Sequence, residues 1–200
     1  MGTYRYKELN NCVRNELVEL KFTGVGMMYV ALLSEEEYNR YNSDITSVKR
    51  YYSSSPVYFR ASDSEKMYIV HDLNGEDITN IEGHIRRFAP NFTSTDVQSL
   101  PQNGKTFVCN AHDTEAKESM IQYWKDNQDQ KSKLDLTKKH FICPSCRKTV
   151  DTETLNGAHV YRINDSNKTQ YITPTCETCN KSKVDRIFMV DRVDLIIPPQ

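Results

Sequence analysis

The sequence predicts an α+β fold in two parts, a mixed N-terminal domain over residues 1–130 and a small cysteine-rich module over residues 131–200. Three observations lead to this prediction. Apolar and aromatic runs of strand length alternate with stretches of helical periodicity in the N-terminal part. A polar and charged stretch at 124–140 then separates that part from the remainder. Four of the six cysteines lie beyond this stretch.

Composition excludes several classes of function. The formal net charge of −1 excludes a uniformly basic nucleic-acid coat, although it is compatible with a local basic patch. No run of about 18 or more apolar residues exists, so we expect no membrane partner. The N-terminal residues lack the apolar segment of a secretory signal peptide. We therefore expect an intracellular, cytoplasmic protein that is not secreted.

The first elements of the N-terminal domain follow from local patterns. An apolar run at 25–33 predicts a strand. Ser34 and Glu37 come next with the spacing of a capping box, which predicts a short helix. Two aromatic and β-branched runs at 56–61 and 66–73 are separated by a short polar stretch, and this arrangement predicts a hairpin.

The rest of the domain is predicted to contain two helices and a strand. The first helix is predicted from apolar residues at helical spacing with a proline after them: Ile78, Ile81, Ile85, Phe88 and Pro90. A β-branched and aromatic run at 105–111 predicts a strand. The second helix, over 113–127, places Ala116, Met120 and Trp124 on one face.

No motif in the N-terminal domain assigns a role to it. The twelve tyrosines could stack against bases, but strands are rich in tyrosine for structural reasons. Arg86 and Arg87 are interpreted as solvated helix charges in preference to a phosphate clamp. A protein partner could bind through this domain. We interpret Cys12 and Cys109 as free, buried residues, while Cys109 with His112 could alternatively form half of a second metal site.

The remaining four cysteines form two Cys-x-x-Cys pairs, Cys143 with Cys146 and Cys176 with Cys179. Disulfides are rare in a reducing compartment, so this paired spacing indicates metal binding. Two intervening residues allow a tight turn that directs both sulfur atoms at one ion. Zinc accepts four thiolates in a tetrahedral site that leaves no position for water. The sequence therefore predicts a structural zinc site with four cysteine ligands.

A hairpin and a helix are predicted around this site. The turn-rich stretch 164–170 separates two strand-like runs at 157–163 and 170–175. The second cysteine pair begins a helix that is predicted over 177–188. A cysteine-bearing turn, a hairpin and a helix around one zinc ion make a treble-clef arrangement.

The motif CPSC…LNGAHV…YITPTCETCNKSK resembles the zinc-bearing form of the HNH endonuclease family, over roughly residues 139–198. This resemblance implies nucleic-acid binding, with DNA expected in preference to RNA, and phosphodiester cleavage. It implies that His159 is the general base that takes a proton from the attacking water. Asn180 would lie near a catalytic divalent ion, usually Mg²⁺, and Lys183 matches the lysine that commonly follows.

The sequence departs from the family pattern at two positions. Ala158 stands where the family often has an acidic or histidine metal ligand, and Tyr171 stands where it usually has asparagine. Asn164 or Asn167 in the predicted loop could supply the missing amide. An alternative interpretation of His159 is structural, with a hydrogen bond from its imidazole to a thiolate or a backbone carbonyl. The module would then be an inactive scaffold that binds a protein partner.

Basic residues cluster around both cysteine pairs. Those near the first pair are Lys131, Lys133, Lys138, Lys139, Arg147 and Lys148, and those on the predicted helix are Lys181, Lys183 and Arg186. Such clusters can follow the phosphates of nucleic acid. We expect these contacts from Arg147 and Lys148 and from the three cations of the helix. The alternative is a solvated face without a nucleic-acid role.

Overall fold

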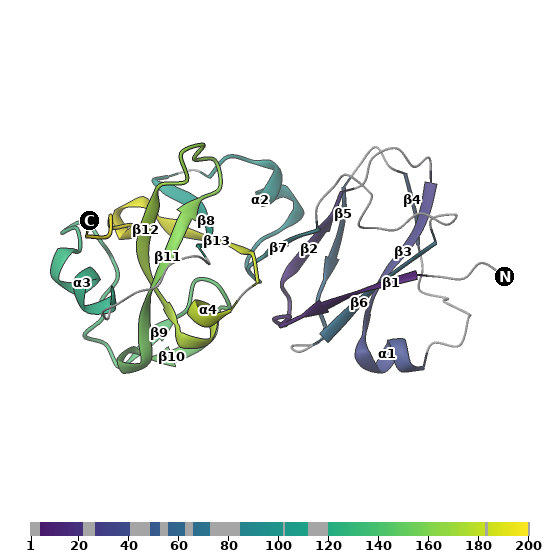
Figure 1. Cartoon of the computed structure of the whole chain (residues 1–200), viewed down its shortest axis with the longest axis horizontal. Helices are drawn as coiled ribbons and strands as arrows, with labels where there is room; N and C mark the ends of the chain where they lie inside the picture. Colours follow the sequence, from purple (N-terminus) through teal and green to yellow (C-terminus); the bar gives the residue numbers. More distant parts are fainter. Residues whose placement is uncertain are drawn as a thin grey trace. The chain divides into compact units, whose positions relative to one another are not determined.

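Two compact units, Met1–Pro90 and Asn91–Gln200, make up the computed structural model of the chain (Figure 1). Each unit is described by itself. The structure describes residues 5–21, 27–40, 49–52, 56–62, 66–72, 85–101, 103–111, 120–182 and 184–199.

The first unit is built from two antiparallel groups of strands. One is a four-stranded sheet in the order β1-β6-β3-β4, with β1 Arg5–Asn10, β3 Met27–Ser34, β4 Lys49–Tyr52 and β6 Lys66–Asp72. In the other, β2 (Leu17–Leu20) pairs with β5 (Val57–Arg60) on one side and with β7 (Ile85–Phe88) on the other. Helix α1, Glu35–Asn39, follows β3 directly.

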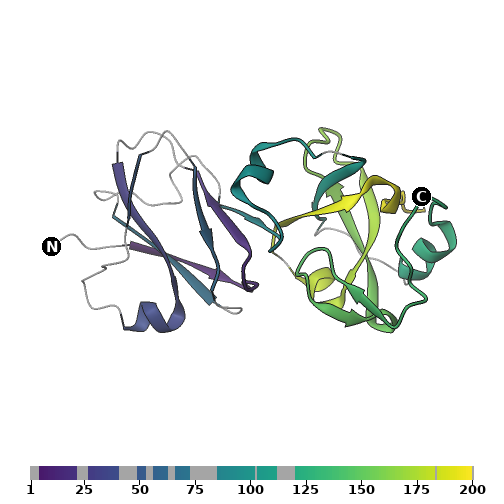
Figure 2. The ribbon, with the colours of Figure 1, turned by 180° about the vertical axis from the view of Figure 1, so that it is seen from behind.

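The core of the first unit lies between these two groups of strands (Figures 1 and 2). Val30 of β3 and Ile69 of β6 are completely buried and belong to the same apolar cluster as Val18 of β2 and Val57 of β5. Burial of side chains from both groups is the main source of stability for such a two-layered unit.

Two predictions for the first unit are confirmed. The apolar run predicted as a strand forms β3 from Met27 onward, and the two residues before it lie outside the described part. The capping box is present at α1, because the Ser34 hydroxyl accepts from the Glu37 amide at 3.2 Å and the Glu37 carboxylate accepts from the Ser34 amide at 2.7 Å. Four-residue signals of this kind act locally, which is why sequence alone reveals them.

The hairpin predicted from 56–61 and 66–73 is wrong. β5 pairs with β2, whereas β6 pairs with β1 and β3, so the two neighbouring runs belong to different groups of strands. Pairing partners are chosen by burial across the core, and the pattern of one run does not specify them.

The helix predicted up to Phe88 is also wrong at its end, because Ile85–Phe88 forms strand β7. The earlier part of that helix lies outside the described residues. Arg87 is not solvated: its guanidinium donates to the buried Glu16 carboxylate at 2.6 and 2.9 Å. It also donates to the backbone oxygens of Asn10 and Asn11, so this buried pair ties β7 to the turn between β1 and β2.

The second unit contains six strands and three short α-helices among its described residues. The strands are β8 Lys105–Asn110, β9 His140–Ile142, β10 Thr149–Asp151, β11 Leu155–Arg162, β12 Gln170–Cys176 and β13 Arg186–Asp191. The helices are α2 Ser94–Gln98, α3 Met120–Asn127 and α4 Glu177–Lys181, with 3-10 turns η2 Thr152–Thr154 and η3 Arg192–Asp194. Four strands follow the order β12-β11-β8-β13, and β9 pairs with β10.

The division into units differs from the boundary expected near residue 130, which falls inside the second unit. Strand β8 pairs with both β11 and β13. Gly157 of β11 lies against α3 so closely that a Cβ there would be 2.5 Å from the Met120 carbonyl carbon. The completely buried Trp124 donates from its indole to the Asp194 oxygen at 2.9 Å. Segments on both sides of the polar stretch thus share one core.

The predicted α+β class is confirmed, since strands and helices occur in both units. The strand at 105–111 is confirmed as β8. The second helix is confirmed over Met120–Asn127, and its predicted first part, 113–119, lies outside the described residues. Among the described helices, none has the length and apolar character needed to cross a membrane.

Candidate metal centre

Four cysteine side chains come together at the edge of the β11–β12 hairpin, as the sequence predicts. Cys143 and Cys146 lie in the turn between β9 and β10, while Cys176 ends β12 and Cys179 lies in α4. All four are buried, and their sulfur atoms lie within 4.8 Å of one another. The turn, the hairpin and the helix of a treble clef are thus present in the predicted order.

The first turn has the geometry needed to direct two sulfur atoms at one point. The Cys143 oxygen accepts from the Arg147 amide at 2.8 Å, and the Cys143 amide donates to the Lys148 oxygen at 3.0 Å. Arg147 has a φ of 63°, the left-handed conformation that is uncommon for residues other than glycine. This conformation lets the chain return toward β10 immediately after Cys146.

The second pair is held by backbone contacts around a short helix. The Cys176 amide lies 3.5 Å from the Cys143 sulfur and donates toward it. The Cys179 oxygen accepts from the Ser182 amide at 3.3 Å and from the buried Asn110 side chain at 2.7 Å. The helix therefore ends at Lys181, and the prediction that it continues to residue 188 is wrong.

The donor set and its spacing fit a tetrahedral metal ion. Four sulfur atoms about 2.3 Å from zinc would lie about 3.8 Å apart at the corners of a tetrahedron. The Cys146 and Cys176 sulfur atoms are separated by 3.8 Å. That distance is far longer than the about 2.05 Å of a disulfide. Four cysteines in this arrangement can hold a metal ion such as zinc and leave no position for a substrate.

Crowding of the four thiols also favours a bound cation. Hydrogen bonding from Cys146, and then from the other two thiols, lowers the pKa of Cys143. Hydrogen bonding with Cys143 instead raises the pKa values of Cys176 and Cys179. The cluster therefore resists full ionisation by itself, and a divalent cation would supply the opposing charge. Metal uptake should consequently release protons and weaken as the pH falls.

His159 lies on β11, outside the four-cysteine cluster. It is half-buried, and burial lowers its pKa below the ordinary 6.5, so its imidazole is neutral at pH 7. Side chains alternate along a strand, so His159 points to the opposite face from its neighbour Val160. Val160 lies opposite Asn110, the residue that reaches α4. His159 therefore points away from the face on which Asn110 contacts α4.

The other sequence-predicted residues have mixed positions. Asn180 is half-buried in α4, and no hydrogen bond joins it to His159 within the described part of the chain. Arg147, Lys148 and Lys181 are exposed. Lys183 lies outside the described residues. Arg186 lies on β13 and not on the predicted helix, and it is only 4% exposed; its contact with nucleic acid stays a prediction.

The two remaining cysteines are buried, as expected. The Cys109 sulfur lies 3.8 Å from an Asp185 carboxylate oxygen, and burial raises the pKa of the Cys109 thiol to about 12. A thiol that stays protonated at neutral pH is a poor metal ligand. The alternative half-site of Cys109 and His112 stays a prediction, since His112 lies outside the described residues.

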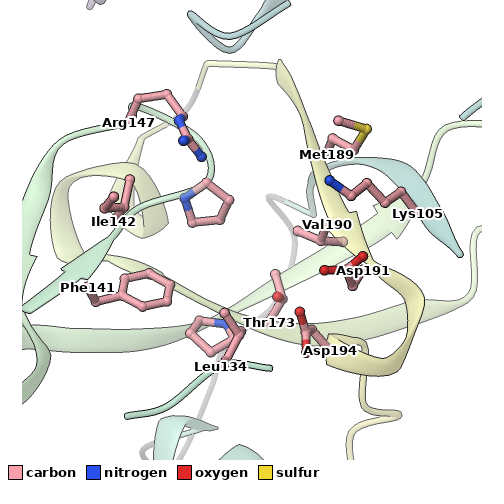
Figure 3. Close-up of a pocket in the computed structure, with 12 residues that line it drawn as sticks. Lys105, Leu134, Phe141, Ile142, Arg147, Thr173, Met189, Val190, Asp191 and Asp194 are labelled. Carbon is pink, nitrogen blue, oxygen red and sulfur yellow. The ribbon is translucent and has the colours of Figure 1, made fainter. Parts of the chain in front are cut away.

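A pocket beside the first cysteine pair was not apparent from the sequence (Figure 3). It has a volume of about 180 Å³. Its polar lining comes from five residues that are far apart in the sequence: Lys105, Arg147, Thr173, Asp191 and Asp194. Burial raises the pKa of the Asp194 carboxyl, and a hydrogen bond from Ser132 opposes this effect. No local motif marks these residues as a group.

Comparison with known proteins finds no matching family model, curated protein or solved structure. The resemblance to HNH endonucleases therefore rests on the motif alone. What the chain's own geometry establishes is a buried cluster of four cysteines that could bind a metal ion.

Proposed function

We propose that the second unit is a zinc-stabilised module that binds nucleic acid. The observation that carries this proposal is the position of exposed cations on the segments that the cysteines join. Arg147 and Lys148 follow Cys146 directly, and Lys181 comes two residues after Cys179. A metal ion held by both pairs would fix these cations relative to one another. Such clusters attract nucleic-acid phosphates whatever the base sequence.

Rigid attachment matters because ordering a side chain or a loop on binding costs free energy. The Arg147 backbone is already fixed by its hydrogen bond to the Cys143 oxygen. Lys181 is partly neutralised by an ion pair with Glu177 in the same helix, but both side chains are exposed, so this pair is weak. Phosphate can therefore displace Glu177 at low cost.

Replacement of Arg147, Lys148 and Lys181 by alanine should weaken DNA binding about equally for all sequences. Each lost phosphate contact reduces the slope of log K against log salt by about 0.9, so the slope should flatten by up to about three units. Fluorescence anisotropy with a labelled duplex between low and moderate salt measures it. A matched variant, with Lys125, Lys168 and Arg192 replaced, should keep the wild-type slope.

An unchanged slope in the first variant would contradict the proposed surface. The protein-adaptor interpretation would then be preferred. Its first candidate surface is the cluster of Tyr6, Tyr38 and Tyr68 in the first unit, where the Tyr38 and Tyr68 rings stack at 4.0 Å and Tyr6 is 57% exposed.

Phosphodiester cleavage is a second candidate function, favoured by the state of His159. Because burial lowers its pKa, the neutral imidazole that a general base needs is present at pH 7. The residues around His159 do not fit a magnesium ion. Ala158 is completely buried, and the described residues contain no second cluster of three or more His, Cys, Asp and Glu side chains. The cleavage proposal therefore rests on His159, and the role of Asn180 stays a prediction.

Under this proposal, His159→Ala should abolish cleavage of plasmid DNA in buffer with Mg²⁺, while zinc content and DNA affinity stay unchanged. His140→Ala is the matched control, since His140 is an exposed histidine on β9. Wild-type cleavage should rise with pH and reach half its maximum below pH 6.5, because the base must lose its proton first. Cleavage that persists in His159→Ala would eliminate His159 as the base, whereas no cleavage by the wild type would remove this candidate function and leave binding.

A further inference from the structure

The pocket beside the first cysteine pair has the size and walls of a site for one flat ring system. Its volume of about 180 Å³ is smaller than the roughly 300–1,000 Å³ of pockets for drug-sized ligands. Phe141 of β9, Pro144 of the cysteine turn and Pro174 of β12 form apolar walls. Figure 3 shows the Phe141 ring directed toward the pocket. An aromatic ring beside prolines offers a flat surface on which a planar ligand can stack.

Charged side chains line two sides of this pocket. Arg147 lies on the side of the cysteine turn, across the pocket from Asp191, Asp194 and Thr173, and Lys105 lies on the same side as Asp191 (Figure 3). Lys105 and Asp191 are register partners on β8 and β13. Even so, no ion pair joins any two of the four charged side chains within the described part of the chain. These four charged side chains therefore remain available to a ligand.

The acidic end contains a buried polar group that lacks a partner. Thr173 is only 1% exposed, and its hydroxyl oxygen has no hydrogen-bond partner. Asp194 is 4% exposed, and one carboxylate oxygen accepts from the Ser132 hydroxyl at 2.6 Å. An unpaired buried hydroxyl is unfavourable, so its presence beside a buried carboxylate indicates that hydrogen-bonding groups arrive with a ligand.

We propose that this pocket binds a single unstacked guanine nucleotide, with the base against Phe141, its N–H edge at Asp191 and Asp194, and its phosphate at Arg147 and Lys105. The choice of ligand rests on the proposed nucleic-acid function. The nucleotide can be free or an unpaired residue of a strand, because both present the same base edge and phosphate.

Guanine fits the acidic end better than the other bases. Its ring N–H and its amino group lie side by side, so both donate to one carboxylate, which accepts two parallel hydrogen bonds. Adenine and cytosine place an acceptor nitrogen beside their amino group, and uracil flanks its single N–H with two carbonyl oxygens. These acceptors would face a carboxylate. A planar guanidinium such as that of Arg147 is well suited to the phosphate at the other end.

Titration of the full chain with guanosine 5′-monophosphate tests this inference. Trp124 provides the signal, because it is the single tryptophan and its indole donates to the backbone oxygen of Asp194 behind the acidic end. We expect the guanine nucleotide to bind at least about tenfold more tightly than uridine 5′-monophosphate, as for hydrogen bonds to a charged group. Asp191→Asn should weaken binding of the guanine nucleotide by a similar factor. Lys105→Gln should weaken the binding of the guanine, adenine, cytosine and uracil nucleotides equally.

Two charge-matched controls separate the pocket from general electrostatics. Glu153→Gln and Lys168→Gln remove one charge each from exposed positions outside the pocket, and binding should not change. Equal affinity for the guanine and uridine nucleotides, no binding of either, or an unchanged affinity in Asp191→Asn would overturn the inference. Preference for a free zwitterionic amino acid would also overturn it.

A second arm identifies the source of the nucleotide. A single-stranded oligonucleotide with one unpaired guanine should compete with the free nucleotide and lose affinity in Asp191→Asn. If the chain binds duplex DNA through the exposed cations but does not bind guanine nucleotides, the inference about the pocket is wrong and the proposed function stands. Guanine-nucleotide binding without binding of any strand would defeat the proposed function and leave a site for a free nucleotide.

Discussion

Replacement of Cys176 by serine should unfold the second unit and leave the first unit folded. Structural zinc contributes an apparent binding free energy on the order of 10–16 kcal/mol in zinc-finger peptides. That range matches or exceeds the about 5–15 kcal/mol that stabilises a typical domain. Cys176 lies where β12 ends and α4 begins. Without its sulfur ligand, the ends of both elements would no longer be held by the metal. Trp124 fluorescence should shift to the solvent-exposed spectrum, because the single tryptophan is now completely buried.

Cys109→Ala is the matched control for this experiment. Cys109 is buried in the same unit but does not belong to the four-cysteine cluster. This variant should keep the native fluorescence at room temperature. Its free energy of unfolding should fall only by the amount that a small cavity costs. A native Trp124 spectrum in Cys176→Ser, with no metal present, would show that the unit folds without its metal centre.

A second large effect is expected in the first unit, where Glu16→Ala should lower the free energy of unfolding by about 3–5 kcal/mol. Glu16 is completely buried, and Arg87 is only 8% exposed. Removal of the carboxylate leaves the Arg87 guanidinium buried without its counter-charge. Urea unfolding of the full chain, followed by hydrogen exchange in peptides covering β2 and β7, measures the loss where it occurs.

Two comparisons make this prediction specific. Glu19→Ala should cost less, because its partner Arg86 has a side chain that is 44% exposed and can be hydrated. Replacement of both Glu16 and Arg87 by apolar residues should also cost less than Glu16→Ala, because no buried charge remains. An equal loss in all three variants would contradict the assignment of the effect to an unpaired buried charge.

Local signals account for the parts of the fold that the sequence predicts correctly. The capping box at Ser34 and the turn after Arg162 depend on residues close in the chain, so their patterns are sufficient. The two cysteine pairs are distant from each other, but each pair has a specific spacing and a shared chemistry. The metal cluster could therefore be predicted before its geometry was known.

The errors occur where distant pairing decides the structure. Ile85 and Phe88 are three residues apart, which suits a helix, yet pairing of β7 with β2 makes this segment a strand. The run Ile187–Val190 is apolar and of strand length, which is typical of a strand such as β13. The predicted helix over 177–188 overlapped this run, so the strand was not predicted. Burial of Arg186 follows from that strand, and no local pattern distinguishes it from an exposed cation.

The pocket and the unit boundary could not be predicted for a related reason. The pocket lining is assembled from β8, the cysteine turn, β12 and the C-terminal segment, which the sequence separates by tens of residues. The polar stretch at 124–140 resembles a linker in composition. It nevertheless lies within one unit, since Trp124 before it and Asp194 after it are joined by a hydrogen bond.

The most direct test of the metal centre is native mass spectrometry of the full chain purified without added metal. The mass should exceed that of the bare chain by one zinc ion per molecule, and the excess should disappear on mild acidification and in Cys176→Ser. The four cysteines that would bind the ion are Cys143, Cys146, Cys176 and Cys179. A wild-type chain that carries no metal, that contains iron, or that keeps its zinc in Cys176→Ser would contradict a zinc site built from these four cysteines.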